Sequence, residues 1–249
     1  MRLLLRILLG GGLLALAFIA SRALEHGGEV GLFNASAFAL VIIGPLGVAL
    51  VAYERSEIVR HVRAVITALG DANEAGRRAS AAAFVAMAQA KKGGRLQEIA
   101  AVADAGSTSR EVRAAALLIV KRYDRAALRE ALLAQASSEV NGLKRGEDFF
   151  LTLARAAPAF GLIGTILGFI DLLRQLSDAS KLGPGMALAL TATLYGIATS
   201  YCVYHPLAKA LSAQARLRAG AWREAEQAAL LVHDERGAQD VQAIWERAA

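Results

Sequence analysis

Two long apolar segments of this sequence carry prolines, glycines and hydroxyl side chains at the spacing of one helical face. In residues 156–170 the face holds a proline, two glycines and a hydroxyl, at Pro158, Gly161, Thr165 and Gly168. In residues 186–207 a second face of small and polar residues follows the same spacing before a closing proline, at Ala189, Thr193, Gly196, Ser200 and Pro206. Polar groups inside a membrane are costly and mark functional sites by default, so Thr165 and Thr193 are candidate functional residues.

The glycines on these faces have a structural explanation as well. Small residues let helices approach closely in lipid, and Gly164 with Gly168 forms a GxxxG pair. We therefore expect four glycines to pack the helices together: Gly161, Gly164, Gly168 and Gly196. Packing alone does not call for Thr165 on the same face, although a Thr hydroxyl can also bond the carbonyl four residues earlier in its own helix.

Four apolar segments must position these residues: 8–20, 35–52, 156–170 and 186–207. The chain has 249 residues, of which 55% are hydrophobic. A bilayer core of roughly 30 Å needs about 20 apolar residues per helix, a length that the segments reach with their flanks. The roughly 100 residues between the second and third segments are rich in Ala, Arg and Glu and contain no Pro. We predict an all-α polytopic membrane protein with four transmembrane helices and a helical domain between the second and third.

The distribution of basic residues orients these helices. Sixteen Lys and Arg lie between residues 53 and 150 and six follow residue 207, whereas the two short connections hold very few. Cytoplasmic segments of membrane proteins are enriched in Lys and Arg, so we place the central segment and both termini in the cytoplasm. The expected segments are a first transmembrane pair (1–53), a cytoplasmic helical domain (54–150), a second transmembrane pair (151–211) and a cytoplasmic tail (212–249).

The first apolar segment allows two interpretations, and the central segment can be divided further into helices. Residues 1–20 also fit a cleavable signal peptide, which would leave three spans; retention is favoured because an even number of spans keeps both basic segments on one side. In the central segment, Ser109 is expected to cap a helix that begins at Arg110. One further helix is expected over 126–140, with Gly142 as a break before another helix that starts at Arg145.

Several function classes are excluded by what the sequence lacks. It has no catalytic motif, no phosphate-binding loop and no pair of His residues at metal-binding spacing, so we expect neither an enzyme, nor a metal site, nor a cofactor. The single cysteine, Cys202, allows no disulfide within the chain. The central segment carries 12 acidic residues against its 16 basic ones and few aromatics, so nucleic-acid binding is not expected. No Asp or Glu lies near the centre of any apolar segment, so an ion path through this protein would need a carboxylate from another chain.

Several stretches resemble the MotA/TolQ/ExbB family. APAFGLIGTILGFIDLLRQL at residues 157–176 and LGPGMALALTATLYGIATSYCVYHPLAKAL at residues 182–211 resemble its signature, with support from LVIIGPLGVALVAY at 40–53 and AKKGGRL at 90–96. Within the family, the flagellar stator branch has four spans with the large cytoplasmic segment between the second and third. The chain is most similar to that branch.

The resemblance implies a subunit of an ion channel in the bacterial inner membrane. Such subunits form a pentameric ring around a dimer of a MotB-like single-span partner, whose Asp binds the transported ion. By motif matching, Pro158 and Pro206 resemble the two functional prolines of the family, and Thr165 and Thr193 resemble its pore-lining hydroxyls. The transported ion is expected to be H+, with Na+ as the alternative.

The same resemblance implies contact with a flagellar rotor protein through cytoplasmic charges. Lys91 takes the position of the family's Arg, but Ile99 falls where the Glu should be, and Glu98 comes one residue early. One residue is about 100° of rotation on a helix, so Glu98 can face another direction. Two alternatives therefore stay open: a TolQ/ExbB-like energy-transducing subunit with an ExbD-like or TolR-like partner, and a membrane scaffold that conducts no ions.

Overall fold

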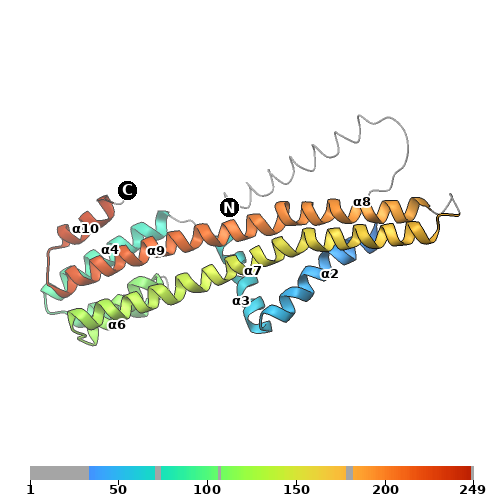
Figure 1. The fold of residues 1–249 in the computed structure, drawn as a ribbon. Coiled ribbons are helices and arrows are strands. Elements are labelled where there is room, and N and C mark those ends of the chain that lie inside the picture. The colour runs from blue at the N-terminus through green and yellow to red at the C-terminus, as the bar shows by residue number, and fades with distance from the viewer. Residues whose placement is uncertain (1–33, 71–73, 106–107, 178–181, 248–249) are drawn as a thin grey trace. The chain divides into compact units, whose positions relative to one another are not determined.

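The computed structural model of the chain describes residues 34–70, 74–105, 108–177 and 182–247. Every regular element in these ranges is a helix (Figure 1), so the expected all-α class is confirmed. The first apolar segment, residues 8–20, lies outside the described residues. The choice between a retained first helix and a signal peptide lies outside them as well.

The described helices fall into two compact units. The first unit comprises residues 34–70 and 143–212, and the second comprises residues 74–142 and 213–247, with the gaps given above. This division follows packing, whereas the four segments expected from the sequence followed hydropathy. Residues 55–70 therefore group with the apolar helices, and the C-terminal tail groups with most of the central segment.

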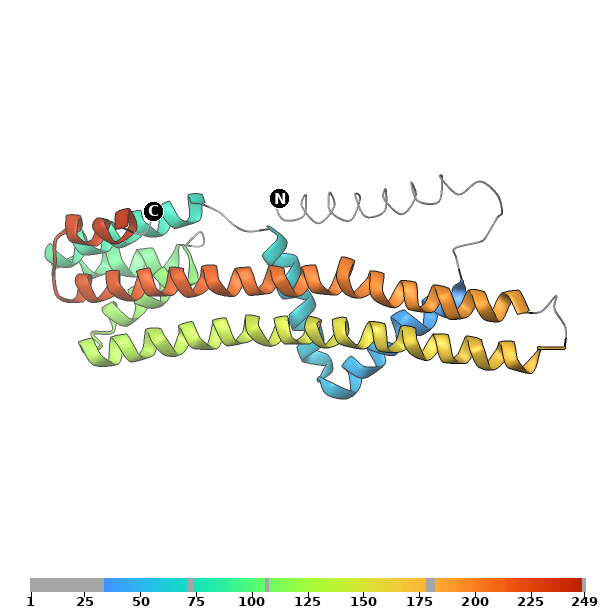
Figure 2. The ribbon, with the colours of Figure 1, turned by 45° about the horizontal axis from the view of Figure 1, so that its top comes forward.

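The first unit contains α2 (Ala35–Ala52), α3 (Arg55–Gly70), α8 (Leu182–Thr199), the π-helical turn η2 (Ser200–Tyr204) and parts of α7 (Arg125–Arg174) and α9 (His205–His233). Among the described residues, three helical stretches are long and apolar enough to cross a membrane: Ala35–Ala52, Arg125–Arg174 and Leu182–His233. They contain the second, third and fourth apolar segments of the sequence. Within the first unit, α7 and α8 lie side by side (Figure 2), and α2 packs against α8.

A single helix, α7, occupies the region where the sequence predicts two. The expected break at Gly142 is wrong, because α7 continues without interruption over Arg125–Arg174. A glycine inside a helix costs only about 1 kcal/mol relative to alanine, which is too little to end a helix with buried side chains on both sides. Leu132 before the glycine is 1% exposed and Phe149 after it is 2% exposed.

The start of α2 is attached to α8 by polar and aromatic contacts. The side-chain oxygen of Asn34 accepts a hydrogen bond from the Ala37 N–H at 3.0 Å and caps the helix. The Asn34 backbone N–H donates to the hydroxyl of Tyr195 on α8 at 3.2 Å. The Tyr195 ring also meets Phe38 edge to face, with 6.3 Å between the ring centres.

His61 of α3 is buried in the core of the first unit, with 3% of its surface exposed. Its ring lies 5.4 Å from the ring of Phe149 and 6.3 Å from that of Tyr53, measured between ring centres. Burial lowers the pKa of His61 below its ordinary value of 6.5, and the charges of Arg60 and Arg145 lower it further, against the opposing effect of Glu57. The fold therefore favours the neutral imidazole.

We expect the stability of the protein to fall as the pH is lowered through the ordinary pKa of His61. The unfolded chain takes up a proton at about pH 6.5, whereas the folded chain takes it up only at lower pH, so acid favours unfolding in this window. Replacing His61 by leucine should reduce this dependence, measured as the melting temperature in detergent at about pH 7.5 and about pH 5.5. An unchanged pH dependence in His61→Leu would contradict the assignment.

The second unit consists of α4 (Glu74–Lys92), α5 (Leu96–Asp104), α6 (Arg110–Val120), α10 (Ala238–Arg247) and the remaining parts of α7 and α9. Many of its buried residues are alanines, and five of the larger side chains in its core are Phe84, Met87, Ile99, Leu128 and Trp222. Helix α6 begins at Arg110, as the sequence predicts, but the Ser109 hydroxyl makes no cap and lies 3.0 Å from the hydroxyl of Ser80.

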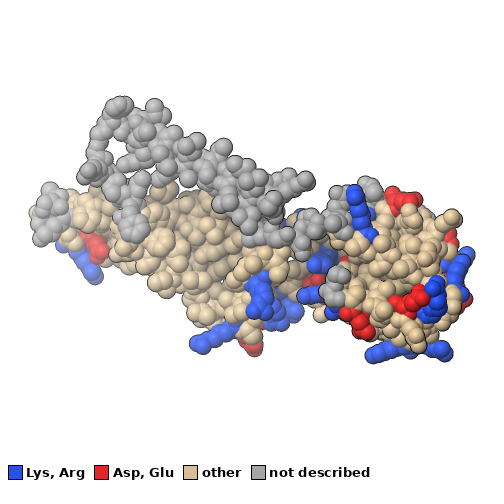
Figure 3. Space-filling model, turned by 180° about the vertical axis from the view of Figure 1, so that it is seen from behind, with Lys and Arg blue, Asp and Glu red and all other residues tan. Residues whose placement is uncertain are grey.

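The surface separates charged from apolar regions. In Figure 3 the charged side chains, Lys and Arg in blue and Asp and Glu in red, form separate groups on the surface. A broad tan area between these groups shows no charged side chain. Many apolar side chains of α2, α7 and α8 are exposed, for example Val51 at 91%, Leu173 at 66% and Leu190 at 70%. Exposed apolar faces of this extent suit lipid or another protein chain.

Candidate ion-pathway site between α7 and α8

Glycines allow α7 and α8 to approach until their backbones are in contact. A Cβ atom on Gly161 would lie 2.9 Å from the carbonyl oxygen of Ala192, and one on Gly196 would lie 2.7 Å from that of Ala157. Real Cβ atoms do not come this close to other heavy atoms, so each of the two positions needs a glycine. Close approach of this kind is the packing mode of small residues in membrane helices.

The same contact continues toward the end of α7. A Cβ on Gly168 would lie 2.6 Å from the carbonyl oxygen of Gly185 and 2.7 Å from the backbone nitrogen of Ala189. A Cβ on Gly164 would overlap the side chain of Ala192. The four glycines expected from the sequence to pack helices therefore all lie on the side of α7 or α8 that faces the other helix.

The hydroxyls of Thr165 and Thr193 meet across this interface and form a hydrogen bond. The Thr165 oxygen also lies 3.2 Å from the carbonyl oxygen of Gly161 in its own helix and 3.1 Å from that of Ala189 in α8. The Thr193 oxygen lies 3.4 Å from the same Ala189 oxygen. Both threonines are half-buried.

The threonine pair can offer oxygen ligands but carries no charge. Each hydroxyl has one hydrogen, so Thr165 can donate to only one of its three neighbouring oxygens at a time. If Thr193 donates to Thr165, then Thr165 can donate to a carbonyl, and lone pairs of Thr193 remain to accept from water or to bind a cation. A hydroxyl does not titrate near pH 7, so the pair can coordinate an ion or a proton-bearing water but cannot store the proton itself.

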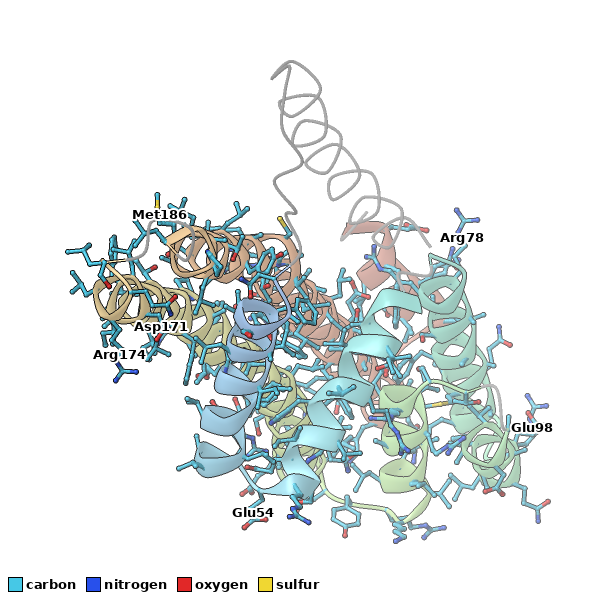
Figure 4. All side chains as sticks on the ribbon, turned by 90° about the vertical axis from the view of Figure 1, so that its right-hand side faces the viewer. Glu54, Arg78, Glu98, Asp171, Arg174 and Met186 are labelled. Carbon is cyan, nitrogen blue, oxygen red and sulfur yellow. The ribbon has the colours of Figure 1, made fainter. Side chains whose placement is uncertain are left out.

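Acidic side chains are absent from the neighbouring stretches of both helices. No Asp or Glu occurs in residues 149–170 of α7 or, among the described residues, in 182–223 of α8, η2 and α9. The next acidic residue of α7 is Asp171, near the end of the helix. One of its carboxylate oxygens lies 3.9 Å from a guanidinium nitrogen of Arg174. Figure 4 labels both of these residues, and Met186 of α8 lies toward the same end of the unit. Among the described residues, no group of His, Cys, Asp and Glu side chains could hold a metal ion.

The two prolines lie where the hydrogen bonding of the helices is interrupted. Pro158 is inside α7 and is half-buried. Pro206 is the second residue of α9, and only His205 lies between it and η2. The spacing in the fourth apolar segment predicts Ser200 on its polar face but assigns it no role of its own. The structure shows that its hydroxyl bonds the carbonyl oxygen of Ala154, four residues before Pro158.

Lys91 and Glu98 belong to the second unit and do not take part in the threonine site. Lys91 lies in the last turn of α4 and is half-buried. Glu98 is exposed in the first turn of α5 and forms a 2.8 Å ion pair with Arg95. Ile99, the next residue, is fully buried in the core, so the two neighbouring positions point in different directions.

Two known proteins are similar in sequence to part of this chain. Motility protein A of Borreliella burgdorferi is 39% identical over 90 residues, which are 36% of this chain and 35% of that protein. Chemotaxis protein PomA of Vibrio alginolyticus is 36% identical over 95 residues, which are 38% of each chain. The matched part thus spans little more than a third of these curated relatives.

The fold is similar over nearly the whole chain to that of solved structures. The structure of C. jejuni MotAB matches with a TM-score of 0.85 and 17% identity, covering 97% of this chain and 94% of that one. The flagellar MotAB stator complex from Bacillus subtilis matches with a TM-score of 0.80 and 19% identity, covering 94% and 92%. The sequence model of the MotA/TolQ/ExbB proton channel family matches residues 97–224, more than half of the chain. The protein therefore belongs to the MotA/TolQ/ExbB proton channel family.

Proposed function

We propose that this chain is the MotA-like ion-conducting subunit of a motor that converts ion-motive force into mechanical work, with flagellar rotation as the driven process. The observation that carries the proposal is the hydroxyl pair of Thr165 and Thr193, held between two helices that are long and apolar enough to cross a membrane. Membership of a proton channel family supports it, and so does the likeness in sequence to proteins named for motility.

In this proposal Thr165 and Thr193 line the ion path, and the ion is H+. Because the neighbouring stretches of α7 and α8 supply no carboxylate, the titratable group comes from a MotB-like single-span partner. Five copies of this chain surround two copies of that partner, and the exposed apolar faces of α2, α7 and α8 then contact lipid or the other chains. The assembly lies in the bacterial inner membrane with both termini of this chain in the cytoplasm.

The remaining candidate residues have supporting roles in the proposal. Pro158 and Pro206 shape the helices along the path. The glycines at 161, 164, 168 and 196 hold α7 against α8 at the distance that the threonine pair needs. Lys91 and Glu98 supply charges for contact with a rotor protein, and the exposure of Glu98 supports this role while its ion pair with Arg95 opposes it.

The proposal predicts a mixed ring when the chain is coexpressed with the product of its neighbouring gene. We expect a complex of five copies of this chain and two of a single-span protein with a membrane Asp, measured by native mass spectrometry after purification in mild detergent. A partner with a peptidoglycan-binding domain would favour the flagellar motor, and an ExbD-like partner would favour the energy-transducing alternative. As a control, the partner's Asp is replaced by Asn, which should leave the assembly intact and stop ion flux. Recovery of this chain alone would contradict the proposal and favour a scaffold.

A further inference from the structure

Ser200 compensates for the hydrogen bond that Pro158 removes from α7. Proline has no N–H, so the carbonyl oxygen of Ala154 lacks the helical donor that residue 158 would otherwise supply. The Ser200 hydroxyl donates to that oxygen from the neighbouring helix, with 2.7 Å between the two oxygen atoms. Ser200 and Ala154 are each 2% exposed, so bulk water has no access to take the place of the hydroxyl.

Ser200 also begins the irregular turn that precedes the second proline. It is the first residue of the π-helical turn η2, and its carbonyl oxygen accepts a hydrogen bond from the N–H of His205, five residues later. Pro206 follows and cannot donate. A π turn contains one residue more than an α-helical turn and often marks a functional site. Ser200 thus takes part in two irregular sites: its hydroxyl bonds the carbonyl left free by Pro158 in α7, and its own carbonyl accepts the hydrogen bond of the π-helical turn before Pro206.

We propose that Ser200 is a positioning residue of the ion path, an inference that rests on the function proposed above. A Cβ on Gly196 would lie 3.2 Å from the Cα of Pro158 and 3.2 Å from that of Gly161, so the helices are in backbone contact between the serine bond and the threonine pair. The direction that α7 takes after Pro158 therefore sets how the hydroxyls of Thr165 and Thr193 meet. Ser200 holds that direction from the side of α8.

A double-mutant cycle tests the hydrogen bond independently of ion flux. Ser200→Ala should lower the melting temperature of the detergent-purified complex, because the carbonyl of Ala154 is left buried without a donor. In the Pro158→Ala background the backbone N–H at position 158 is restored and bonds that carbonyl, so Ser200→Ala should have little further effect. Thr191→Ala is the matched control, since the Thr191 hydroxyl bonds Ala187 in its own helix at 2.6 Å. Its effect should be the same in both backgrounds.

Ion flux tests the positioning role. In cells that express the complex with its partner, we expect proton influx to fall about tenfold in Ser200→Ala at an unchanged protein level. Ser200→Cys keeps a weaker donor of similar volume and should give an intermediate value. Thr191→Ala should retain the influx of the unmodified complex.

Each failure has a separate meaning. Equal losses of melting temperature from Ser200→Ala in both backgrounds would overturn the hydrogen-bond assignment. Normal influx in Ser200→Ala, together with the expected coupling to Pro158, would overturn the positioning role and leave the proposed function in place. Absence of influx in the unmodified complex would overturn the proposed function, and the positioning role with it.

Discussion

Proton influx is expected to be lost when Thr193 is replaced by alanine, with a fall of at least about a hundredfold, equivalent to ~2.7 kcal/mol of barrier height. The substitution removes one of the two paired hydroxyls and leaves Thr165 with the carbonyl oxygens of Gly161 and Ala189 as partners. The contact between α7 and α8 is made by small residues and does not depend on this hydroxyl, so the complex should still assemble. Influx is measured with a pH-sensitive fluorescent protein in the cytoplasm.

Two variants separate the chemistry of the hydroxyl from its position in α8. Thr193→Ser keeps the oxygen and should retain a substantial part of the influx. Thr191→Ala removes a hydroxyl that is bonded within α8 and should have little effect. Influx in Thr193→Ala equal to that in Thr191→Ala, at the same protein level, would show that the threonine pair has only a packing role.

Replacing Gly168 by alanine is expected to separate α7 from α8 and to destabilise the complex. The added Cβ would lie 2.6 Å from the carbonyl oxygen of Gly185 and 2.7 Å from the nitrogen of Ala189, and neither backbone atom can rotate away. Overpacking of this kind costs about 1–3 kcal/mol or more, which exceeds the gain of up to ~1 kcal/mol from the higher helix propensity of alanine. The melting temperature in detergent should therefore fall.

Gly183→Ala is the matched control, because nothing lies within 4 Å of the position that its Cβ would take. Both substitutions add one methyl group to a glycine of the same helix pair, so only the local space differs. We expect Gly183→Ala to leave the melting temperature unchanged or slightly raised. Equal melting temperatures of the two variants would mean that α7 and α8 are not in backbone contact in the assembled protein.

Much of the fold could be predicted from the sequence because apolar runs and helical periodicity are local properties. The apolar run 35–52 coincides with α2, Ala35–Ala52, and the start of α6 at Arg110 follows the expected serine. The break expected at Gly142 is wrong because the end of a helix depends on packing between distant parts of the chain, which is not a local property. Whether a single glycine ends a helix depends on how firmly the flanking turns are packed. Leu132 is buried in the core of the second unit and Phe149 in the core of the first, both among side chains that are distant in sequence.

Which residues share a helical face can be read from the amino acids alone, because residues three and four apart lie on the same face of a helix. The family can be recognised in the same way, because its signature lies in contiguous stretches of the chain. Which of these faces meet follows from the packing of the folded chain. The pairing of Thr165 with Thr193 depends on the rotation of two helices about their axes, and the bond from Ser200 to Ala154 depends on their register along the interface. Rotation and register are set by the summed packing of both helices, which no local pattern in the sequence specifies.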